Sequence, residues 1–293
     1  MPRAEANGIE LEYDTFGDPA DPALLLIMGL ATQMTAWDPR FCALLADRGF
    51  HVIRFDNRDA GLSTQFDHLP VPDILAILGG DPGTAPYLLA DLAADAVGLL
   101  DALAVERAHV VGVSMGGMIG QELAINHPER VLSLCSVMST TGDRAVGQPS
   151  HEALAAILSP GGVDREQAIE RGVNVLRAIG SPAPELAVTD EWRRERTAAA
   201  YDRANRPAGG ARQFAAIVAS PDRTQELGKL TIPVLVMHGD QDRLVNVSGG
   251  QATAAAVLGA ELIVFPGLGH DLPEPLWTAF VDAIARNAAG QPG

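Results

Sequence analysis

One stretch near the middle of the chain restricts the possible folds more than any other. His109 is followed by the β-branched residues Val110 and Val111 and then by Gly112-Val113-Ser114-Met115-Gly116. A helical pattern then runs from Gly117 to Asn126. This order predicts a strand, a sharp turn and a helix, because glycines two residues before and after Ser114 remove side chains that would collide in strained backbone. The Ser114 hydroxyl is then expected above the end of a sheet, beside the positive N-terminal end of the helix.

The segments before this turn predict alternating strands and helices. A hairpin is expected where Asn7-Gly8, a pair suited to a type I′ turn, joins residues 4–6 to the alternating residues 9–13. Residues 23–28 form a continuous apolar run, typical of a strand buried on both faces of a parallel sheet. A helix over 39–48, ending at Gly49, and a strand over 51–55 follow.

Two segments lead from that strand to the central turn. Residues 65–86 are rich in proline and glycine and predict a surface excursion near a cleft, with one helical turn at Ile74–Leu78. Residues 87–103 have apolar side chains at helical spacing and predict a helix. Asp91, Asp95 and Asp101 fall on its other, polar face.

The second half of the chain predicts one sheet interrupted by an insertion. A buried strand is expected over 131–137, but strand signals are absent from 141 to about 228, where helix-like pieces are broken by glycine and proline. Strand patterns resume at 232–237 and 262–265, with an alanine-rich helix between them and an amphipathic helix over 275–287. We therefore expect a core made of 1–140 and 229–293, and a helical cap over 141–228.

Composition excludes several classes of function. Acidic residues outnumber basic ones 37 to 21, a net charge of -16, which disfavours a nucleic-acid partner and indicates a solvated acidic surface. Cys42 and Cys135 have neither metal-ligand nor disulfide spacing, so we expect two buried thiols, no metal and no cofactor. The N-terminus lacks a signal-peptide core and apolar runs are strand-sized, so the sequence predicts no membrane partner, a cytoplasmic protein, and a monomer or homodimer.

An activated serine needs a histidine base, and only one of seven histidines is well placed. Five histidines are poorly placed, because they lie at the start of a strand, at the end of a helix or in loops of unclear position: His51, His68, His109, His127 and His151. His238 ends a strand but precedes the nearby acids, whereas a serine in such a turn is followed by acid and then histidine. His270, in a glycine-flexed loop after the last strand, remains.

The acid is expected in the loop after the preceding strand, His238-Gly239-Asp240-Gln241-Asp242. Asp240 and Asp242 are both eligible, and periodicity does not separate them. Asp242 lies further into the loop and is freer to point at a histidine, so we favour it.

With these three positions identified, the chain resembles the α/β-hydrolase fold serine hydrolases that carry a helical cap. The resemblance extends from the hairpin to the last helix and includes Asp56-Asn57-Arg58-Asp59-Ala60-Gly61-Leu62-Ser63, similar to the family's Arg-x-x-Gly-x-Ser loop. It implies a mostly parallel eight-stranded sheet flanked by helices, with a cap inserted after strand 6. It also implies Ser114 as nucleophile and His270 as base, and it supports Asp242 as the acid. Arg58 and Asp59 are expected to brace their loop rather than to contact substrate.

One loop departs from the family pattern. Where the family has His-Gly-x after the third strand, this chain has Met28-Gly29-Leu30. Because the family's oxyanion donor is the backbone N–H of the third residue, Leu30 can still serve beside the N–H of Met115, but the side chains that brace the loop must differ. The Met-Gly pair and the preceding Asp-Pro-rich loop are similar to the aclacinomycin methylesterase branch.

The expected reaction is hydrolysis of carboxylic esters of small to medium apolar molecules. We expect an apolar pocket lined by Met28, Trp37, Met118, Trp192, Tyr201 and Phe214, although each could equally be ordinary core. Lactone, peracid or carbon–carbon bond chemistry with the same three residues is an alternative, and a ligand-binding protein without turnover is an alternative of another class.

Overall fold

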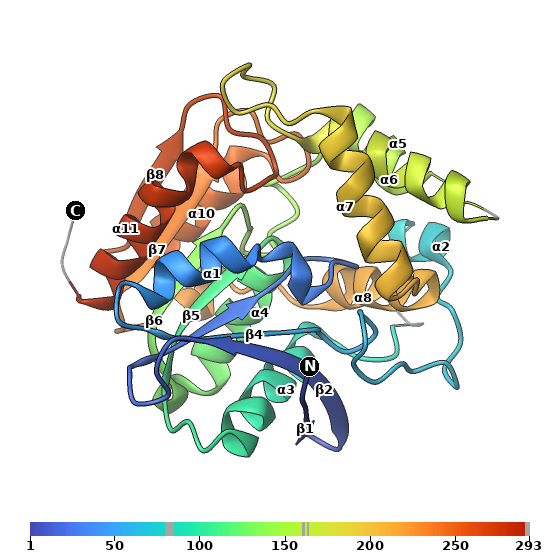
Figure 1. The fold of residues 1–293 in the computed structure, drawn as a ribbon. Coiled ribbons are helices and arrows are strands. Elements are labelled where there is room, and N and C mark those ends of the chain that lie inside the picture. The colour runs from blue at the N-terminus through green and yellow to red at the C-terminus, as the bar shows by residue number, and fades with distance from the viewer. Residues whose placement is uncertain (80–84, 160–161, 163, 291–293) are drawn as a thin grey trace.

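A twisted sheet forms the centre of the computed structural model, which describes residues 1–79, 85–159, 162 and 164–290 (Figure 1). Within these residues the sheet has eight strands in the order β1-β2-β4-β3-β5-β6-β7-β8. The strands are β1 (Arg3–Ala6), β2 (Ile9–Phe16), β3 (Ala23–Ile27), β4 (His51–Phe55), β5 (Ala108–Val113), β6 (Val131–Val137), β7 (Val234–Gly239) and β8 (Glu261–Phe265).

The direction of the strands determines which loops lie together at one edge of the sheet. The β1–β2 and β2–β4 pairs are antiparallel, and the other neighbouring pairs are parallel. The predicted hairpin is confirmed, since Asn7 and Gly8 have φ of 50° and 77° and connect the paired residues Ala6 and Ile9. The carboxyl ends of β3 to β8 therefore meet at the same edge, where ligands bind in sheets of this type.

Helices cover both faces of the sheet. Within the described residues the helices are α1 (Pro39–Ala46), α2 (Ile74–Leu78), α3 (Leu89–Ala102), α4 (Met115–Asn126), α5 (His151–Ile157), α6 (Arg165–Ile179), α7 (Asp190–Arg203), α8 (Pro207–Ala219), α9 (Thr224–Leu227), α10 (Val247–Ala256) and α11 (Trp277–Ala288). Short 3-10 turns lie at Met34–Ala36, Pro128–Arg130 and Glu274–Leu276. The predicted helix over 39–48 ends two residues early, and the helix after Ser114 begins at Met115 rather than Gly117.

The core consists of two apolar layers, one on each face. Along β3, Leu24 and Leu26 pack with residues of α1 and α11, whereas Leu25 and Ile27 pack with residues of α3 and α4. All four are fully buried, as expected for a strand whose apolar run is continuous. Both cysteines are buried and free, which confirms the prediction for them.

Between β6 and β7 the described residues of 141–228 contain helices and no strand, as predicted. We call α5 to α9 the inserted helices. Figure 1 shows α5 to α8, in yellow-green to orange, gathered on one side of the molecule, with α2 beside α8. None of the helices in the described ranges is long and apolar enough to cross a membrane.

One prediction about α3 is wrong. Asp91 and Asp101 are exposed, but Asp95, expected on the polar face, is 1% exposed. Its carboxylate accepts two hydrogen bonds of 2.6 Å from the Arg58 guanidinium and one from the Asn7 side-chain amide. Helical spacing alone cannot distinguish a buried ion pair from a solvated face.

Candidate functional site

The predicted turn around Ser114 is present and tightly packed. Ser114 has φ 57° and ψ −120°, a backbone conformation that is costly for a residue with a side chain. A Cβ on Gly112 would lie 2.0 Å from the Gly116 carbonyl oxygen, and one on Gly116 would lie 2.1 Å from the Ile27 carbonyl oxygen. Only glycine fits at either position, so β3, β5 and α4 approach closely and hold Ser114 at the carboxyl edge of the sheet.

Asp242 and His270 lie in the loops after β7 and β8, as predicted. His270 Nδ1 and Asp242 Oδ2 are 2.7 Å apart. The other oxygen, Oδ1, accepts the backbone N–H groups of Leu244 and Val245 at 2.9 Å each. Asp240, the alternative acid, is exposed and accepts the N–H of Gly267 instead. The geometry therefore pairs His270 with Asp242.

Burial would raise the pKa of Asp242, but the neighbouring histidines more than offset this effect. His270 and His238 both lie against Oδ2, and their charge and hydrogen bonds hold the pKa of Asp242 well below its usual range. His238, set aside on chain order, is fully buried, with Nε2 2.8 Å from the Val245 carbonyl oxygen and 3.4 Å from Asp242 Oδ2. Asp242 is therefore an ionised group that can orient His270 through Nδ1–H.

The histidine loop is also held by the inserted helices. The backbone N–H of His270 donates to the Ile179 carbonyl at the end of α6, at 2.7 Å. Ser181 Oγ accepts the N–H of Gly269 and donates to the carboxylate of Asp271. Within the described residues no hydrogen bond joins Ser114 Oγ to His270 Nε2. Such bonds commonly tighten only when substrate binds.

The loop after β3 lies directly beside Ser114. A Cβ on Gly29 would be 3.2 Å from Ser114 Cβ and 3.7 Å from its Oγ. In the described part of the chain, the backbone N–H groups of Leu30 and Met115 donate to no acceptor. Two free N–H groups beside a serine are the arrangement that an oxyanion hole requires.

Side chains from the loop after β4 hold the loop after β3 at both of its ends. Asn57 Nδ2 donates to the Met28 carbonyl at 3.0 Å, and Asp56 Oδ1 accepts the N–H of Met34 at 2.7 Å. Asp56 and Asn57 are at most 1% exposed. The sequence predicts that different side chains brace this loop, but no local pattern identifies Asp56 and Asn57, although both belong to the segment 56–63.

Arg58 and Asp59 connect their loop to neighbouring elements, and their expected separation from substrate stays a prediction. Arg58 pairs with Asp95, and Asp59 accepts two hydrogen bonds, of 2.8 and 2.7 Å, from Arg212 of α8 and one from the Tyr87 hydroxyl. Burial would raise the pKa of Asp59, but the hydrogen bonds from Arg212, the Phe66 N–H and Tyr87 lower it overall.

The six residues expected to line a pocket differ in how far they are buried. Trp37 stacks on Phe41 in the core and, like Met28 and Met118, is buried, which is the alternative that the sequence left open. Trp192 is 41% exposed, and Tyr201 and Phe214 are half-buried on α7 and α8. Their role as a pocket stays a prediction.

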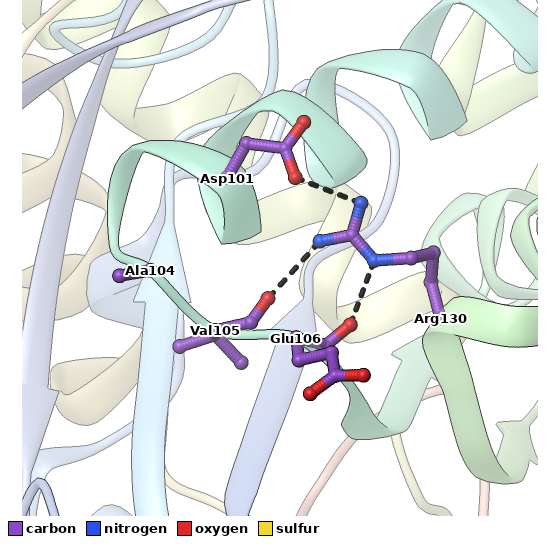
Figure 2. Close-up of a pocket in the computed structure, with 5 residues that line it drawn as sticks. All are labelled: Asp101, Ala104, Val105, Glu106 and Arg130. Atoms are coloured by element: carbon purple, nitrogen blue, oxygen red, sulfur yellow. Dashed lines mark hydrogen bonds and ion pairs between the residues drawn. The ribbon is translucent and has the colours of Figure 1, made fainter.

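A hollow elsewhere on the surface does not belong to this site. It measures about 290 Å³ and is lined by Asp101, Ala104, Val105, Glu106 and Arg130 (Figure 2). Arg130 crosses one side of it, donating to the carbonyls of Val105 and Glu106 and pairing with Asp101. Residues 101–106 precede β5 and Arg130 precedes β6, whereas Ser114 follows β5, so the hollow lies at the opposite edge of the sheet.

Comparison with known proteins identifies relatives over nearly the whole chain. A model of the alpha/beta hydrolase fold matches residues 22–274. The rhodomycin D methylesterase DauP of Streptomyces sp. (strain C5) is 31% identical over 302 residues, covering 92% of this chain and 93% of that protein. The rhodomycin D methylesterase DnrP of Streptomyces peucetius is 31% identical over 303 residues, with the same coverage. In fold alone, the chain resembles the solved enol-lactonase of Burkholderia xenovorans LB400, with a TM-score of 0.74, 23% identity and coverage of 98% of this chain and 100% of that one.

Proposed function

The chain belongs to the alpha/beta hydrolase fold family, and from this membership we propose that it hydrolyses carboxylic esters with Ser114 as nucleophile, His270 as base and Asp242 as the acid. The expected family and the expected ester-hydrolase class agree with relatives that are named as esterases. The observation that carries the proposed roles is the Asp242–His270 hydrogen bond at the sheet edge where Ser114 sits in a strained turn.

The reaction proceeds through an acyl-enzyme. Neutral His270 takes the proton of Ser114 through Nε2 as the hydroxyl oxygen forms a bond to the ester carbonyl carbon. Asp242 fixes the tautomer and stabilises the imidazolium. The N–H groups of Leu30 and Met115 donate to the oxyanion, and the leaving alkoxide takes the proton back from His270 as its bond to carbon breaks. Water then releases the acid by the same steps, with His270 as its base.

The substrates are proposed to be esters of small to medium apolar molecules, with methyl esters a preferred group. Two rhodomycin D methylesterases at 31% identity support this class. The inserted helices are proposed to form a cap, residues 141–228, that selects the substrate. Their contacts with the histidine loop support this role.

Ser114→Ala tests the proposal directly. Loss of the nucleophile should lower kcat/KM on a p-nitrophenyl ester by at least about 10³-fold, since the residues of such a triad act as a unit. Full esterase activity in Ser114→Ala would contradict the assignment. A fluorophosphonate should label wild type and not the variant.

A substrate panel separates the alternatives. It varies acyl length and alcohol bulk and includes methyl esters of polycyclic compounds and macrocyclic lactones. Faster turnover of lactones, peracids or carbon–carbon bond substrates than of any ester would favour those chemistries. Slow, single-turnover labelling of Ser114 without multiple turnover on any ester would favour a ligand-binding protein.

A further inference from the structure

The peptide unit that follows Leu30 is held from both sides. Its carbonyl, that of Leu30, accepts a hydrogen bond of 3.0 Å from Thr32 Oγ1. Its N–H, that of Ala31, donates to Gln213 Oε1 at 2.8 Å. Thr32 belongs to the same loop, but Gln213 lies on α8 of the inserted helices, 182 residues away in sequence.

Gln213 is satisfied at both ends of its amide and is completely buried. While Oε1 accepts from Ala31, Nε2 donates to the Arg58 carbonyl at 2.7 Å. Since an N–H must donate and a carbonyl must accept, these two partners fix the orientation of the amide. Gln213 therefore joins the loop after β3 to the loop after β4 across the interface with the inserted helices.

The conformation of Ala31 needs this support. Ala31 has φ 54°, in the left-handed region, and such strain persists only where surrounding contacts impose it. Asn57 and Asp56 hold the loop at Met28 and Met34, at its two ends. At its tip, Gln213 provides the contact from outside the loop to the backbone.

Helix α8 is itself fixed against the core beside Gln213. The adjacent Arg212 forms the paired hydrogen bonds to buried Asp59. A Cβ on Gly209 would lie 2.1 Å from the Asp59 carbonyl oxygen, and one on Gly210 would lie 3.0 Å from Ala31 Cβ. The helix is thus in direct contact with the loop, and its register places the Gln213 amide at the Ala31 N–H.

We propose that Gln213 is a positioning residue that holds the Leu30 N–H in the geometry an oxyanion donor requires. The role rests on the proposed function, because it acts through the Leu30 N–H. An oxyanion donor acts only when it lies within about 3 Å of the developing charge, so a loop free to relax would lose part of its transition-state stabilisation.

The test compares Gln213→Met with Gln121→Met on a p-nitrophenyl ester. Gln121 is a matched control, because it is also fully buried and accepts a hydrogen bond from Arg223 at the base of the inserted helices, away from the loop. We expect Gln213→Met to lower kcat by about 10-fold with little change in KM, and to weaken a boronic acid that mimics the tetrahedral intermediate by a similar factor. Gln121→Met should keep both values near wild type.

Gly210→Ala provides a second test, which does not require the protein to fold with a methionine buried at position 213. Alanine favours a helix over glycine, which offsets the cost of the tight contact, so the melting temperature should change little. The added methyl group, 3.0 Å from Ala31 Cβ, should displace the loop and lower kcat about threefold. A protein that is no less stable and yet slower is not what a purely structural role produces.

The outcomes distinguish the two proposals. The proposed function fails if the wild type shows no ester turnover, or if Ser114→Ala turns over esters as fast as the wild type. If wild type is active and Ser114→Ala is not, wild-type kcat and boronic acid affinity in a folded Gln213→Met would overturn the role of Gln213. Equal losses in Gln121→Met would also overturn it. Should Gln213→Met not fold, an unchanged kcat in Gly210→Ala overturns it.

Discussion

The sheet core and its contact with the inserted helices are both largely buried but are built from opposite chemistry. Core residues of β3 such as Leu24 to Ile27 are apolar and fully buried. The contact, which we call the polar interface, comprises Gln33, Asp56, Asp59, Arg203, Arg212 and Gln213. Apolar burial has no direction, whereas hydrogen bonds and ion pairs operate only over a narrow range of distances and angles. Net stability therefore comes mainly from the core, whereas the polar interface fixes positions and costs stability when one partner of a buried ion pair is removed.

The largest expected effect is from breaking the central pair of the polar interface. Arg212→Met leaves the Asp59 carboxylate buried without its guanidinium, which should cost about 3–5 kcal/mol in the free energy of unfolding, measured by urea denaturation. The control is Asp59→Leu combined with Arg212→Met, which removes both charges and should recover much of the loss. A double variant no more stable than the single one would contradict the view that the unpaired charge of Asp59 causes the loss.

The pH dependence of Asp59 should give the next largest effect. Its pKa is lowered in the folded protein, so its contribution to stability is complete above the ordinary aspartate value of 3.8 and is lost as pH falls through the folded value. Asp59→Asn should thus be less stable than wild type by about 2 kcal/mol near pH 6. That difference should shrink near about pH 3, as measured by thermal unfolding at both pH values. A difference in stability between wild type and Asp59→Asn that widens on acidification would show that Asp59 is not held ionised.

Trimming the apolar core should cost less. Ile53→Val, at a fully buried position of β4, removes one methylene and should lower the free energy of unfolding by about 1 kcal/mol while leaving kcat unchanged. Equilibrium denaturation and a p-nitrophenyl ester assay measure the two quantities. A fall in kcat without a comparable loss of stability would mean that the core also sets the geometry of the site.

The smallest effect is expected for an ion pair outside the polar interface. Arg165 and Asp202 join α6 to α7 with both side chains about half exposed. Because water screens such pairs, Arg165→Ala should leave the denaturation midpoint and kcat unchanged. A clear loss of either would show that burial is not what separates the two kinds of polar contact.

Features set by adjacent residues could be predicted from the sequence, whereas polar contacts between distant elements could not. The hairpin at Asn7-Gly8, the buried strand at 23–27 and the turn at Ser114 follow from local pattern, because turn chemistry and strand periodicity are written into adjacent residues. Asp242 and His270 could be found because they follow consecutive strands of the sheet. Asp95 and Gln213 could not, since their partners Arg58 and Ala31 lie in other elements and nothing in the spacing of charged or amide residues reveals them.

The contacts of the inserted helices with the histidine loop and with the loop after β3 limit how this chain can be recombined with relatives. The Ile179 carbonyl and Ser181 hold the histidine loop, and Gln213 holds the loop of Leu30. On the proposed roles, a chimera that receives residues 141–228 from a relative needs an amide at 213 and a hydroxyl at 181 to keep these two loops in place. Transplants chosen by shape alone should lack these hydrogen bonds and turn over slowly.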